Sequence, residues 1–534
     1  MRRAWPNCNN TSRCLRVPHC ALKQRRVGIM RRRPVGVGAT LLLAGLMLAA
    51  CTAGSSSTPA TGSAGSPGGR GTLNVGLTLE PASLDFTKVD GAAIPQVLLT
   101  NVYETLVKQD QDGKIVPGLA TSWDVSADRK TYTFDLTPAV KFSNGDPFTA
   151  ADAVFSINYV KRNWLLSLKS AMNVVADAKA VSPTQLQVTL AKPSNDWLFR
   201  MTTRIGAMMD PKGVADLANT PVGTGPYVFD SWNRGDSITL KVNPTYWGKK
   251  PAYPTVVLKY IKDPTALNNA LLTGTVNVIG SLQAPESLAQ FTGNSKYQVI
   301  EGTTNGEVLL SFNNARATLT NVKVRQAIRY AIDHKALLDT CWAGKGTLIG
   351  SMVPPTDPWY EDRTGDFPYD PAKAKALLSE SGTAAPTLRL RIPALPYAIA
   401  CGQVVKSQLQ QVGITVNLDT LEFKAGWLPQ VFTAHDYDMS IVSQAEPRDL
   451  PAVFGNPHYY TQYDNPQLQA DLAAADAGTP QEQVTYMKKA AKEVSLDAAG
   501  DFLFLLPNII VADKAITGLP TNSITEALDL SALG

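Results

Sequence analysis

Alternating hydrophobic and polar residues predict several short strands in the chain. In 131–136, Tyr132, Phe134 and Leu136 alternate with polar residues, which is the period-two pattern of a strand with one buried face. The same kind of pattern occurs at 72–79, 185–190, 237–242 and 388–392. We therefore expect β-strands over these segments.

Other segments carry the spacing of amphipathic helices. From about Asn321, apolar residues recur on one helical face, namely at Val324, Ala327, Ile328, Ala331 and Ile332. Thr149 and Asp152 have the spacing of a helix N-cap and an acidic third position, and Asp370 is an N-cap followed by proline. A further helix is predicted at 399–411. Because strands and helices mix without a fixed repeat, the predicted fold class is α/β with several sheets.

The N-terminal region has the pattern of an export signal. Three arginines at 31–33 precede an apolar stretch at 36–50, which is too short to span a membrane but suits a secretory signal. Two alanines and Cys51 follow, as in a bacterial lipobox. We predict a signal peptide over 1–50 and lipid attachment at Cys51. The alternative is an ordinary signal peptide that ends near a cysteine.

Neighbouring segments complete this prediction. Residues 1–29 do not resemble a mature domain, so we expect the true start at Met30. Residues 51–71 are almost all small, polar or turn-forming, which predicts a flexible lipid-anchored tether. The most apolar later stretch, 502–512, is too short for a membrane span and contains Pro507. We therefore expect a body held at the outer face of a bacterial cytoplasmic membrane.

The charge of the chain is unevenly distributed. The 534 residues include 50 Lys and Arg against 45 Asp and Glu, a formal net charge of +5. Residues 1–50 hold ten of the basic residues and no acidic residue, which leaves 40 basic and 45 acidic residues, or −5, for the rest. An acidic body has no electrostatic attraction for a phosphate backbone, so no nucleic-acid partner is expected. The hydrophobic share of 44% excludes a disordered chain.

Motifs of catalysis are absent from the sequence after Cys51. Its three histidines form no H-E-x-x-H arrangement, and there is no Walker A loop, C-x-x-C pair or G-x-S-x-G elbow. We therefore expect neither an enzyme nor a bound cofactor or metal. The two remaining cysteines, Cys341 and Cys401, either pair in an oxidising compartment or stay as buried free thiols.

Several short runs resemble, in the same order, those of ABC-importer solute-binding proteins of family 5, the peptide and nickel class. The most specific run is 141–152, K-F-S-N-G-D-P-F-T-A-A-D, which is similar to the family pattern F-x-[DN]-G-x-P-F-T-A-x-D. The others lie at 79–85, 103–107, 116–120, 221–227, 243–247, 311–314 and 324–333. The resemblance extends from about residue 72 to near the C-terminus.

The resemblance implies a two-lobed clamshell of the periplasmic-binding-protein type (class II), with two crossing hinge strands at 307–313 and 502–511. The implied boundaries are 72–304 and 506–534 for lobe I, about 96–219 for an extra subdomain within it, and 305–505 for lobe II. A solute bound between the lobes would draw them closed, because it contacts both only in the closed form. The implied function is a monomeric receptor that delivers short peptides or a related polar solute to an ABC permease and its ATPase.

The resemblance also places candidate ligand-binding residues. In peptide-binding members a carboxylate of the second lobe holds the peptide α-ammonium, and here Glu446 and Asp449 lie in the corresponding segment. Three alternatives stay open. Glu446 or Asp449 binds a cationic amine, or Arg448 and Glu446 form an ion pair at the rim beside a neutral solute, or these are plain surface charges. Arg448 would equally suit an acidic ligand.

Other residues are weaker candidates. Gln444 precedes this segment, Thr78 and Glu80 follow the first predicted strand, and Asn305 precedes the first crossing strand. Trp427 would stack on a ligand side chain or sugar ring, although a tryptophan after a strand-to-helix turn is more often part of the core. Receptors for an oligosaccharide or a metal chelate, and a permease-independent sensor or chaperone-like binder, are the alternative functions. A secreted hydrolase would need an aligned nucleophile and base.

Overall fold

The computed structural model describes residues 71–534, apart from 90, 166 and 384. The predicted signal peptide, the predicted lipid-attachment residue Cys51 and the predicted tether up to residue 70 lie outside the described residues. Within the described residues, no helix is both long enough and apolar enough for a membrane span.

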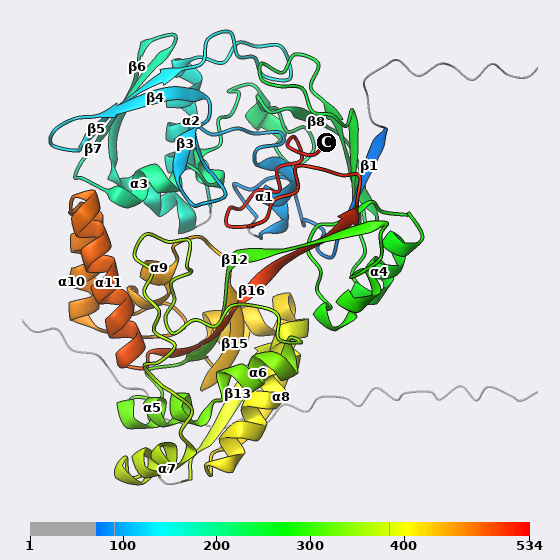
Figure 1. Cartoon of the computed structure of the whole chain (residues 1–534). Helices are drawn as coiled ribbons and strands as arrows, with labels where there is room; N and C mark the ends of the chain where they lie inside the picture. Colours follow the sequence, from blue (N-terminus) through cyan, green and yellow to red (C-terminus); the bar gives the residue numbers. More distant parts are fainter. Residues whose placement is uncertain (1–70, 90, 166, 384) are drawn as a thin grey trace, which may run out of the picture. The chain divides into compact units, whose positions relative to one another are not determined.

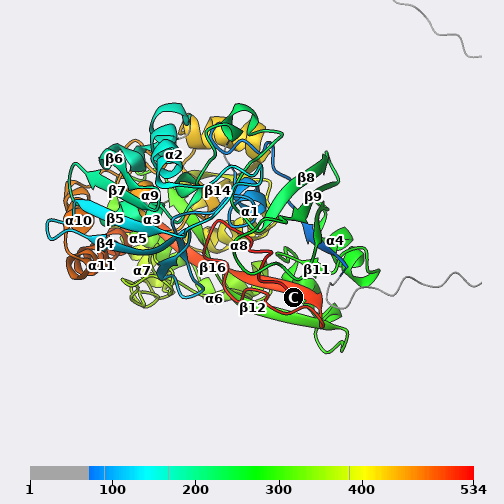
Figure 2. The same ribbon diagram turned by 90° about the horizontal axis from the view of Figure 1, so that it is seen from above.

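A ten-stranded mixed sheet runs through the described part of the chain (Figures 1 and 2). Its strand order is β14-β13-β15-β12-β16-β11-β1-β10-β9-β8. In chain order these strands are β1 (Thr72–Leu77), β8 (Tyr227–Asn233), β9 (Ser237–Val242), β10 (Thr255–Tyr260), β11 (Val278–Ile279), β12 (Tyr297–Phe312), β13 (Thr387–Pro393), β14 (Thr415–Leu421), β15 (Met439–Gln444) and β16 (Gly500–Asp513). Strand β12 is antiparallel to β15 and β16, whereas β1 is parallel to β10 and β13 is parallel to β14.

Two smaller sheets and a set of helices complete the α/β fold. The small sheets are β2 (Val107–Gln109) with β3 (Ile115–Pro117), and β4 (Ala120–Val125), β5 (Thr131–Leu136), β7 (Gln185–Leu190) and β6 (Val175–Ser182) in that order. The α-helices are α1 (Ala93–Leu98), α2 (Ala150–Asn163), α3 (Asn195–Arg200), α4 (Pro264–Leu272), α5 (Val322–Ala331), α6 (His334–Cys341), α7 (Pro371–Glu380), α8 (Pro396–Gln411), α9 (Leu450–Phe454), α10 (Pro466–Ala477) and α11 (Pro480–Leu496). Short 3-10 helices lie at Ser167–Val174, Arg204–Gly206, Gly213–Asp216 and Pro285–Gln290, and a π-helix lies at Phe423–Thr433.

Strands β12 and β16 cross from one half of the large sheet to the other. Figure 1 shows them side by side as they pass from the part that carries β1 and β8, here called the first lobe, to the part that carries β13 and β15, the second lobe. A β-bulge between Thr303 and Glu307 interrupts their pairing between the lobes. Strand β12 begins at Tyr297, earlier than the predicted 307. The prediction missed this first part of the strand because polar residues such as Gln298 interrupt its apolar pattern.

Local capping explains where several helices begin. Thr149 and Asp152 form a reciprocal capping box, in which the Asp152 carboxylate accepts a 2.8 Å hydrogen bond from the Thr149 N–H. Asp370 caps α7 as predicted, and Asn321, near which α5 was predicted to begin, caps that helix. Helix α8 begins three residues earlier than predicted, because Pro396 suits the first helical turn, where its missing N–H is not needed.

The C-terminal segment that follows β16 returns to the first lobe. The Asn101 side chain donates a 2.8 Å hydrogen bond to the carbonyl of Leu528 and accepts one of 3.0 Å from the N–H of Leu530. Leu530 and Leu533 are buried in the same apolar core as Val75. The chain therefore enters and leaves through the same lobe, which fits a clamshell with two crossing strands.

Three of the family-like runs meet at one buried carboxyl group, that of Glu104. It accepts hydrogen bonds from the Thr224 hydroxyl (2.8 Å), the Tyr246 hydroxyl (3.1 Å) and the Trp247 indole N–H (2.9 Å). Burial raises the pKa of Glu104 to about 7, against these hydrogen bonds, which lower it. These runs therefore stabilise the first lobe, and their contacts explain why residues far apart in sequence identify the fold.

In the second lobe, a disulfide joins Cys341 at the end of α6 to Cys401 in α8. The two cysteines are 60 residues apart in sequence. Closing a loop of that length stabilises the folded state by roughly 4 kcal/mol on a chain-entropy estimate.

Candidate ligand-binding site

The segment 446–449, predicted to bind ligand, lies directly after β15 and faces the first lobe. The guanidinium of Arg204 is 3.7 Å from the Glu446 carboxylate. Arg200, the last residue of α3, donates 3.4 Å hydrogen bonds to the carbonyls of Pro447 and Arg448. First-lobe arginines therefore contact this second-lobe segment from across the junction.

Arg448 makes contacts other than those predicted. It has a left-handed backbone conformation (φ 56°), and its guanidinium lies over the rings of Phe199 and Trp359, 3.9 and 4.8 Å from their centroids. Its ion-pair partner is Asp357, at 3.5 Å. The backbone at Arg448 thus directs the side chain between two aromatic rings and towards Asp357. Burial raises the pKa of Asp357 to about 6, although Arg448 lowers it.

Two buried carboxyl groups belong to segments that adjoin here, that of Glu307 on β12 and that of Asp449 after β15. Their relative exposures are 2% and 4%, and one oxygen of each has no hydrogen-bond partner within the described residues. Burial raises the pKa of both groups well above the ordinary range. The neighbouring carboxylates, Asp449 for Glu307 and Glu446 for Asp449, raise it further. An unpaired buried carboxylate is costly, which is the property expected of a group that awaits a cationic partner.

Glu307 was missed by the sequence reasoning, although it has one visible signal. It is the single acidic residue in the otherwise apolar end of β12, G-E-V-L-L-S-F. Its register partner on β15 is Gln444, whose side-chain amide donates a 2.8 Å hydrogen bond to the Tyr460 hydroxyl. The structure thus places the predicted residue Gln444 opposite Glu307, and the predicted Glu446 and Asp449 follow shortly after Gln444 along the chain.

A cavity of about 410 Å³ between the lobes adjoins the segment 446–449. Arg200 from α3 lines it on one side, and Arg448, with residues of α10 and α11 such as Leu472 and Met487, lines it on the other. Arg200 and Arg448 therefore line the cavity and also make the charged contacts of the segment 446–449. Such a site, with a few convergent charged groups beside apolar walls, suits a small polar ligand.

Direct hydrogen bonds also join the two lobes beside this cavity. The Ser194 hydroxyl donates to Asp476 (2.7 Å), and the Asn195 amide donates to the carbonyls of Ala475 (2.8 Å) and Gly478 (2.7 Å). These bonds link the start of α3 to the end of α10 and the turn that follows it, and α3 and α10 lie close together in Figure 1. We call them the interlobe latch. They show that the structure has a closed arrangement of the lobes.

Three further predicted residues, Thr78, Glu80 and Asn305, are not among the residues that line this cavity. Glu80 accepts 2.8 Å hydrogen bonds from the Trp232 indole and the N–H of Gly235. Asn305 donates to the carbonyl of Ile524 at 2.6 Å, and Thr78 directly follows β1. We therefore leave these three residues out of the site developed below.

Trp427 lies in the core of the second lobe. It is 3% exposed, its indole N–H donates a 2.9 Å hydrogen bond to the Ser440 hydroxyl, and its ring packs on Phe423 and Tyr460. The structure therefore places it as the core residue that its position after a turn suggested, and not on an open stacking surface.

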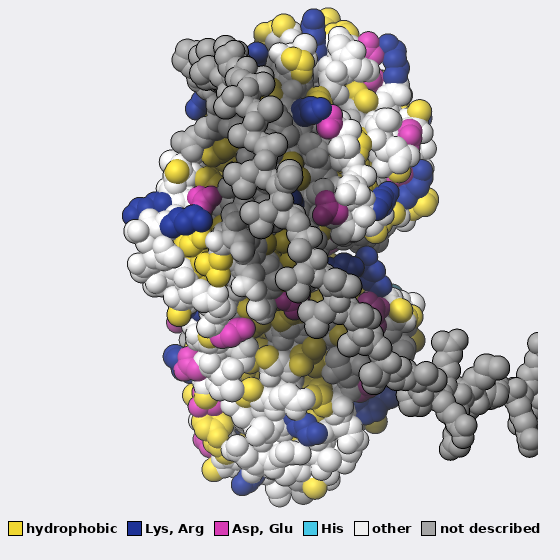
Figure 3. All heavy atoms as spheres, turned by 90° about the vertical axis from the view of Figure 1, so that its right-hand side faces the viewer, with side chains coloured by type: hydrophobic (Ala, Val, Ile, Leu, Met, Phe, Trp, Pro, Cys, Tyr) yellow, Lys and Arg dark blue, Asp and Glu magenta, His cyan; other side chains and the backbone are white. Residues whose placement is uncertain are grey.

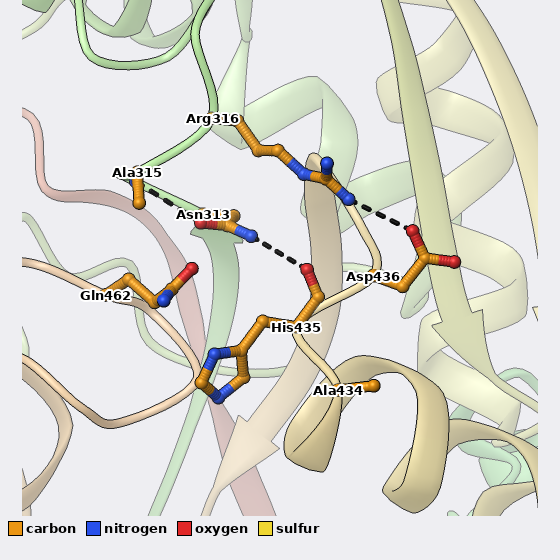
Figure 4. Close-up of a pocket in the computed structure, with 7 residues that line it drawn as sticks. All are labelled: Asn313, Ala315, Arg316, Ala434, His435, Asp436 and Gln462. Carbon is orange, nitrogen blue, oxygen red and sulfur yellow. Dashed lines mark hydrogen bonds and ion pairs between the residues drawn. The ribbon is translucent and has the colours of Figure 1, made fainter. Parts of the chain in front are cut away.

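A second cavity, of about 450 Å³, lies at the other end of β12 and β15 (Figure 4). Figure 4 shows Arg316 directed towards Asp436, at 3.0 Å, and Asn313 directed towards the backbone carbonyl of His435, also at 3.0 Å. Because its charged side chains pair with one another, this cavity offers no unpaired charge for a ligand. The face seen in Figure 3 likewise intermixes basic and acidic side chains. No group of three or more metal-ligating side chains was found among the described residues.

Comparisons with known proteins agree on one family. The model of the bacterial extracellular solute-binding proteins, family 5 Middle, matches residues 114–466. The chain is 31% identical to the nickel-binding periplasmic protein of Escherichia coli K12 over 59% of this chain and 65% of that protein, slightly less than two thirds of its length. It is 30% identical to heme-binding protein A of Haemophilus influenzae over 64% and 68% of the two chains, and 28% identical to the dipeptide-binding protein of Escherichia coli K12 over 63% and 68%.

Solved structures support the same fold. NikA from Brucella suis, in complex with Fe(III)-EDTA, superposes with a TM-score of 0.77 at 23% identity, over 87% of this chain and 99% of that one. DppA from Helicobacter pylori, in complex with the peptide STSA, gives 0.74 at 21% identity, over 87% and 98%. At such identities the likeness shows a shared two-lobed architecture.

Proposed function

The chain belongs to the bacterial extracellular solute-binding proteins of family 5, and from this premise we propose that it is the receptor of an ABC importer for a peptide-like solute with a cationic amine. The observation that carries the proposal is the buried, incompletely hydrogen-bonded Asp449 carboxyl in the segment between the lobes. A ligand ammonium supplies three N–H donors and a positive charge, which together offset the cost of that burial. Curated relatives named for nickel, heme, dipeptides and glutathione leave the substrate class open.

In this proposal the ligand lies between α3 and the α9–α11 side of the second lobe. Glu446 or Asp449 binds the amine, while Gln444 and Arg448 orient the surrounding segment. Arg200 and Arg204 approach the same segment from the first lobe. A ligand held there contacts both lobes only when they are closed, so its binding shifts the population towards the closed form.

The lobe boundaries and the cellular setting belong to the same proposal. Lobe I would comprise 72–304 and 506–534, with the subdomain at about 96–219, and lobe II 305–505. Lipidation of Cys51 and the tether 51–71 would hold a monomer at the outer face of the cytoplasmic membrane. A permease with its ATPase would then accept the closed, loaded form.

The proposal is tested by calorimetric titration of the protein with short peptides and with their N-acetylated forms. We expect free peptides to bind, and acetylation to weaken binding at least tenfold, because it removes the ammonium charge. Aspartate-to-asparagine substitution at Asp449 should reduce the affinity for the free peptides much more than for the acetylated ones. Equal affinity for both forms would refute the role of a cationic amine. A peptide-independent response to a metal chelate or an oligosaccharide would instead support one of the alternative substrates.

A further inference from the structure

The segment 446–448 of the second lobe contacts two elements of the first lobe, α3 and the 3-10 helix that follows it. The Arg204 guanidinium, from that 3-10 helix, is 3.7 Å from the Glu446 carboxylate. The Arg448 guanidinium lies 3.9 Å from the centroid of the Phe199 ring in α3. The side chains of this segment therefore take part in the junction between the lobes.

Arg204 is held in place by the C-terminal segment that follows β16. Its Nε–H donates a 2.7 Å hydrogen bond to the Glu526 carboxylate, and its backbone N–H donates one of 2.8 Å to the other oxygen of that group. The two side chains are only 4% and 9% exposed. The first lobe thus presents a guanidinium of fixed geometry at the junction, which lowers the entropic cost of a contact with the second lobe.

Glu446 and Asp449, the two acids considered for the ligand amine, differ in burial. The Glu446 side chain is 42% exposed, whereas Asp449 is 4% exposed and its Oδ1 has no hydrogen-bond partner among the described residues. An exposed carboxylate stays solvated when its ion pair breaks, whereas a buried one needs a proton or a cation. Glu446 therefore suits an ion pair that forms and breaks as the lobes move, and Asp449 suits the amine.

We propose that Arg204 and Glu446 form a closing contact between the lobes, so that Glu446 acts on affinity through closure and Asp449 is the acid that takes the ligand amine. Glu526 is the residue that positions Arg204. This inference rests on the proposed function and assigns separate roles to its two candidate acids. Because Arg204 and Glu526 both belong to the first lobe, their pair persists in the open form, and opening leaves no buried guanidinium without a partner.

The experiment measures the affinities for Ala-Ala-Ala and for its N-acetylated form by calorimetric titration of the full protein. Glu446→Gln should weaken the binding of both peptides by the same factor, about three- to fivefold, which is the upper end for a partly exposed ion pair. Asp449→Asn should instead weaken mainly the binding of the free peptide. The matched control is Glu361→Gln, because that side chain is 41% exposed and pairs with Arg363 at 2.7 Å within the second lobe. The control should change neither affinity.

A second variant shows whether the effect of Glu446 depends on Arg204. Arg204→Lys keeps a positive charge near Glu526, but an ammonium lacks the planar fork with which a guanidinium contacts two carboxylates. In the Arg204→Lys protein, the further change Glu446→Gln should alter both affinities by less than about 1.5-fold. Thermal melting of the ligand-free variants verifies folding.

The outcomes separate this inference from the proposed function. Unchanged affinities in Glu446→Gln, a loss confined to the free peptide, or an undiminished loss in the Arg204→Lys protein overturns the closing contact and leaves the peptide receptor standing. If neither peptide binds, the peptide function is rejected, and small-angle X-ray scattering of the ligand-free protein decides the inference. A larger radius of gyration in Glu446→Gln than in the wild type and Glu361→Gln supports the closing contact, and equal radii overturn it.

Discussion

The interlobe latch predicts an effect on ligand release from a residue that is absent from the walls of the cavity. Asn195 donates two hydrogen bonds across the junction, of 2.8 Å to Ala475 and 2.7 Å to Gly478. Both bonds join the two lobes, so we expect opening of the lobes to break them. Asn195→Ala should therefore destabilise the closed form while it leaves the charged residues of the segment 446–449 intact.

The magnitude follows from the number of bonds lost. Each neutral hydrogen bond contributes about 0.5–1.5 kcal/mol, so two contribute about 1–3 kcal/mol. That range corresponds to roughly 5- to 150-fold in the closing equilibrium. Ser194 and Arg129 keep their own contacts with the same turn, so the variant still closes. We expect the loss to act on dissociation, because the latch forms only after the ligand has entered.

Stopped-flow tryptophan fluorescence with a bound tripeptide measures this directly. Asn195→Ala should dissociate roughly tenfold faster and associate at an unchanged rate. The control is Asn163→Ala, since the side chain of that exposed asparagine bonds to the Tyr159 carbonyl within its own helix. An unchanged dissociation rate in Asn195→Ala, in a variant that melts like the wild type, would refute the idea that the latch stabilises the closed form.

Three further predictions concern stability. Asp501 is fully buried with Arg329 at 3.1 Å and His334 at 2.9 Å, partners that lower its pKa. In urea unfolding, Asp501→Asn should lower the free energy of unfolding by about 3–5 kcal/mol, and this difference should shrink as pH falls, because the wild-type carboxylate then takes up a proton. Equal stability of the two proteins would contradict this. Glu104 has a pKa raised to about 7, so between about pH 4.5 and 7 its carboxyl is protonated more in the folded than in the unfolded state, and stability falls as pH rises through that range. In Glu104→Gln the melting temperature should depend less on pH over that range. A pH profile like that of the wild type would count against this prediction. Cys401→Ser should lower the free energy of unfolding by up to about 4 kcal/mol, an effect that dithiothreitol reproduces in the wild type only.

Much of the secondary structure was accessible from the sequence because it depends on neighbouring residues. Strands β5, β7 and β9 have the bounds that alternation predicts, and the predicted caps at Thr149 and Asp370 depend on residues two or three positions away. The family-like runs identified the fold for a different reason. They meet at buried points such as Glu104, so their identities are constrained by contacts with one another.

The site was accessible only in part, because its properties arise from contacts between distant segments. The segment 446–449 was placed by resemblance, yet the partner of Arg448 is Asp357, which no local pattern indicates. The properties of Glu307 appear only in the folded protein, because its pKa is raised by burial and by Asp449, a residue far along the chain. A lone acid in an apolar strand was the available signal.

The central claim is that a solute bound between the lobes holds them closed. Small-angle X-ray scattering, recorded without ligand and with a peptide at a concentration that calorimetry shows to be saturating, tests it most directly. The account predicts a smaller radius of gyration in the loaded protein, with scattering that fits the closed structure. Superimposable curves for the empty and the saturated protein would contradict it.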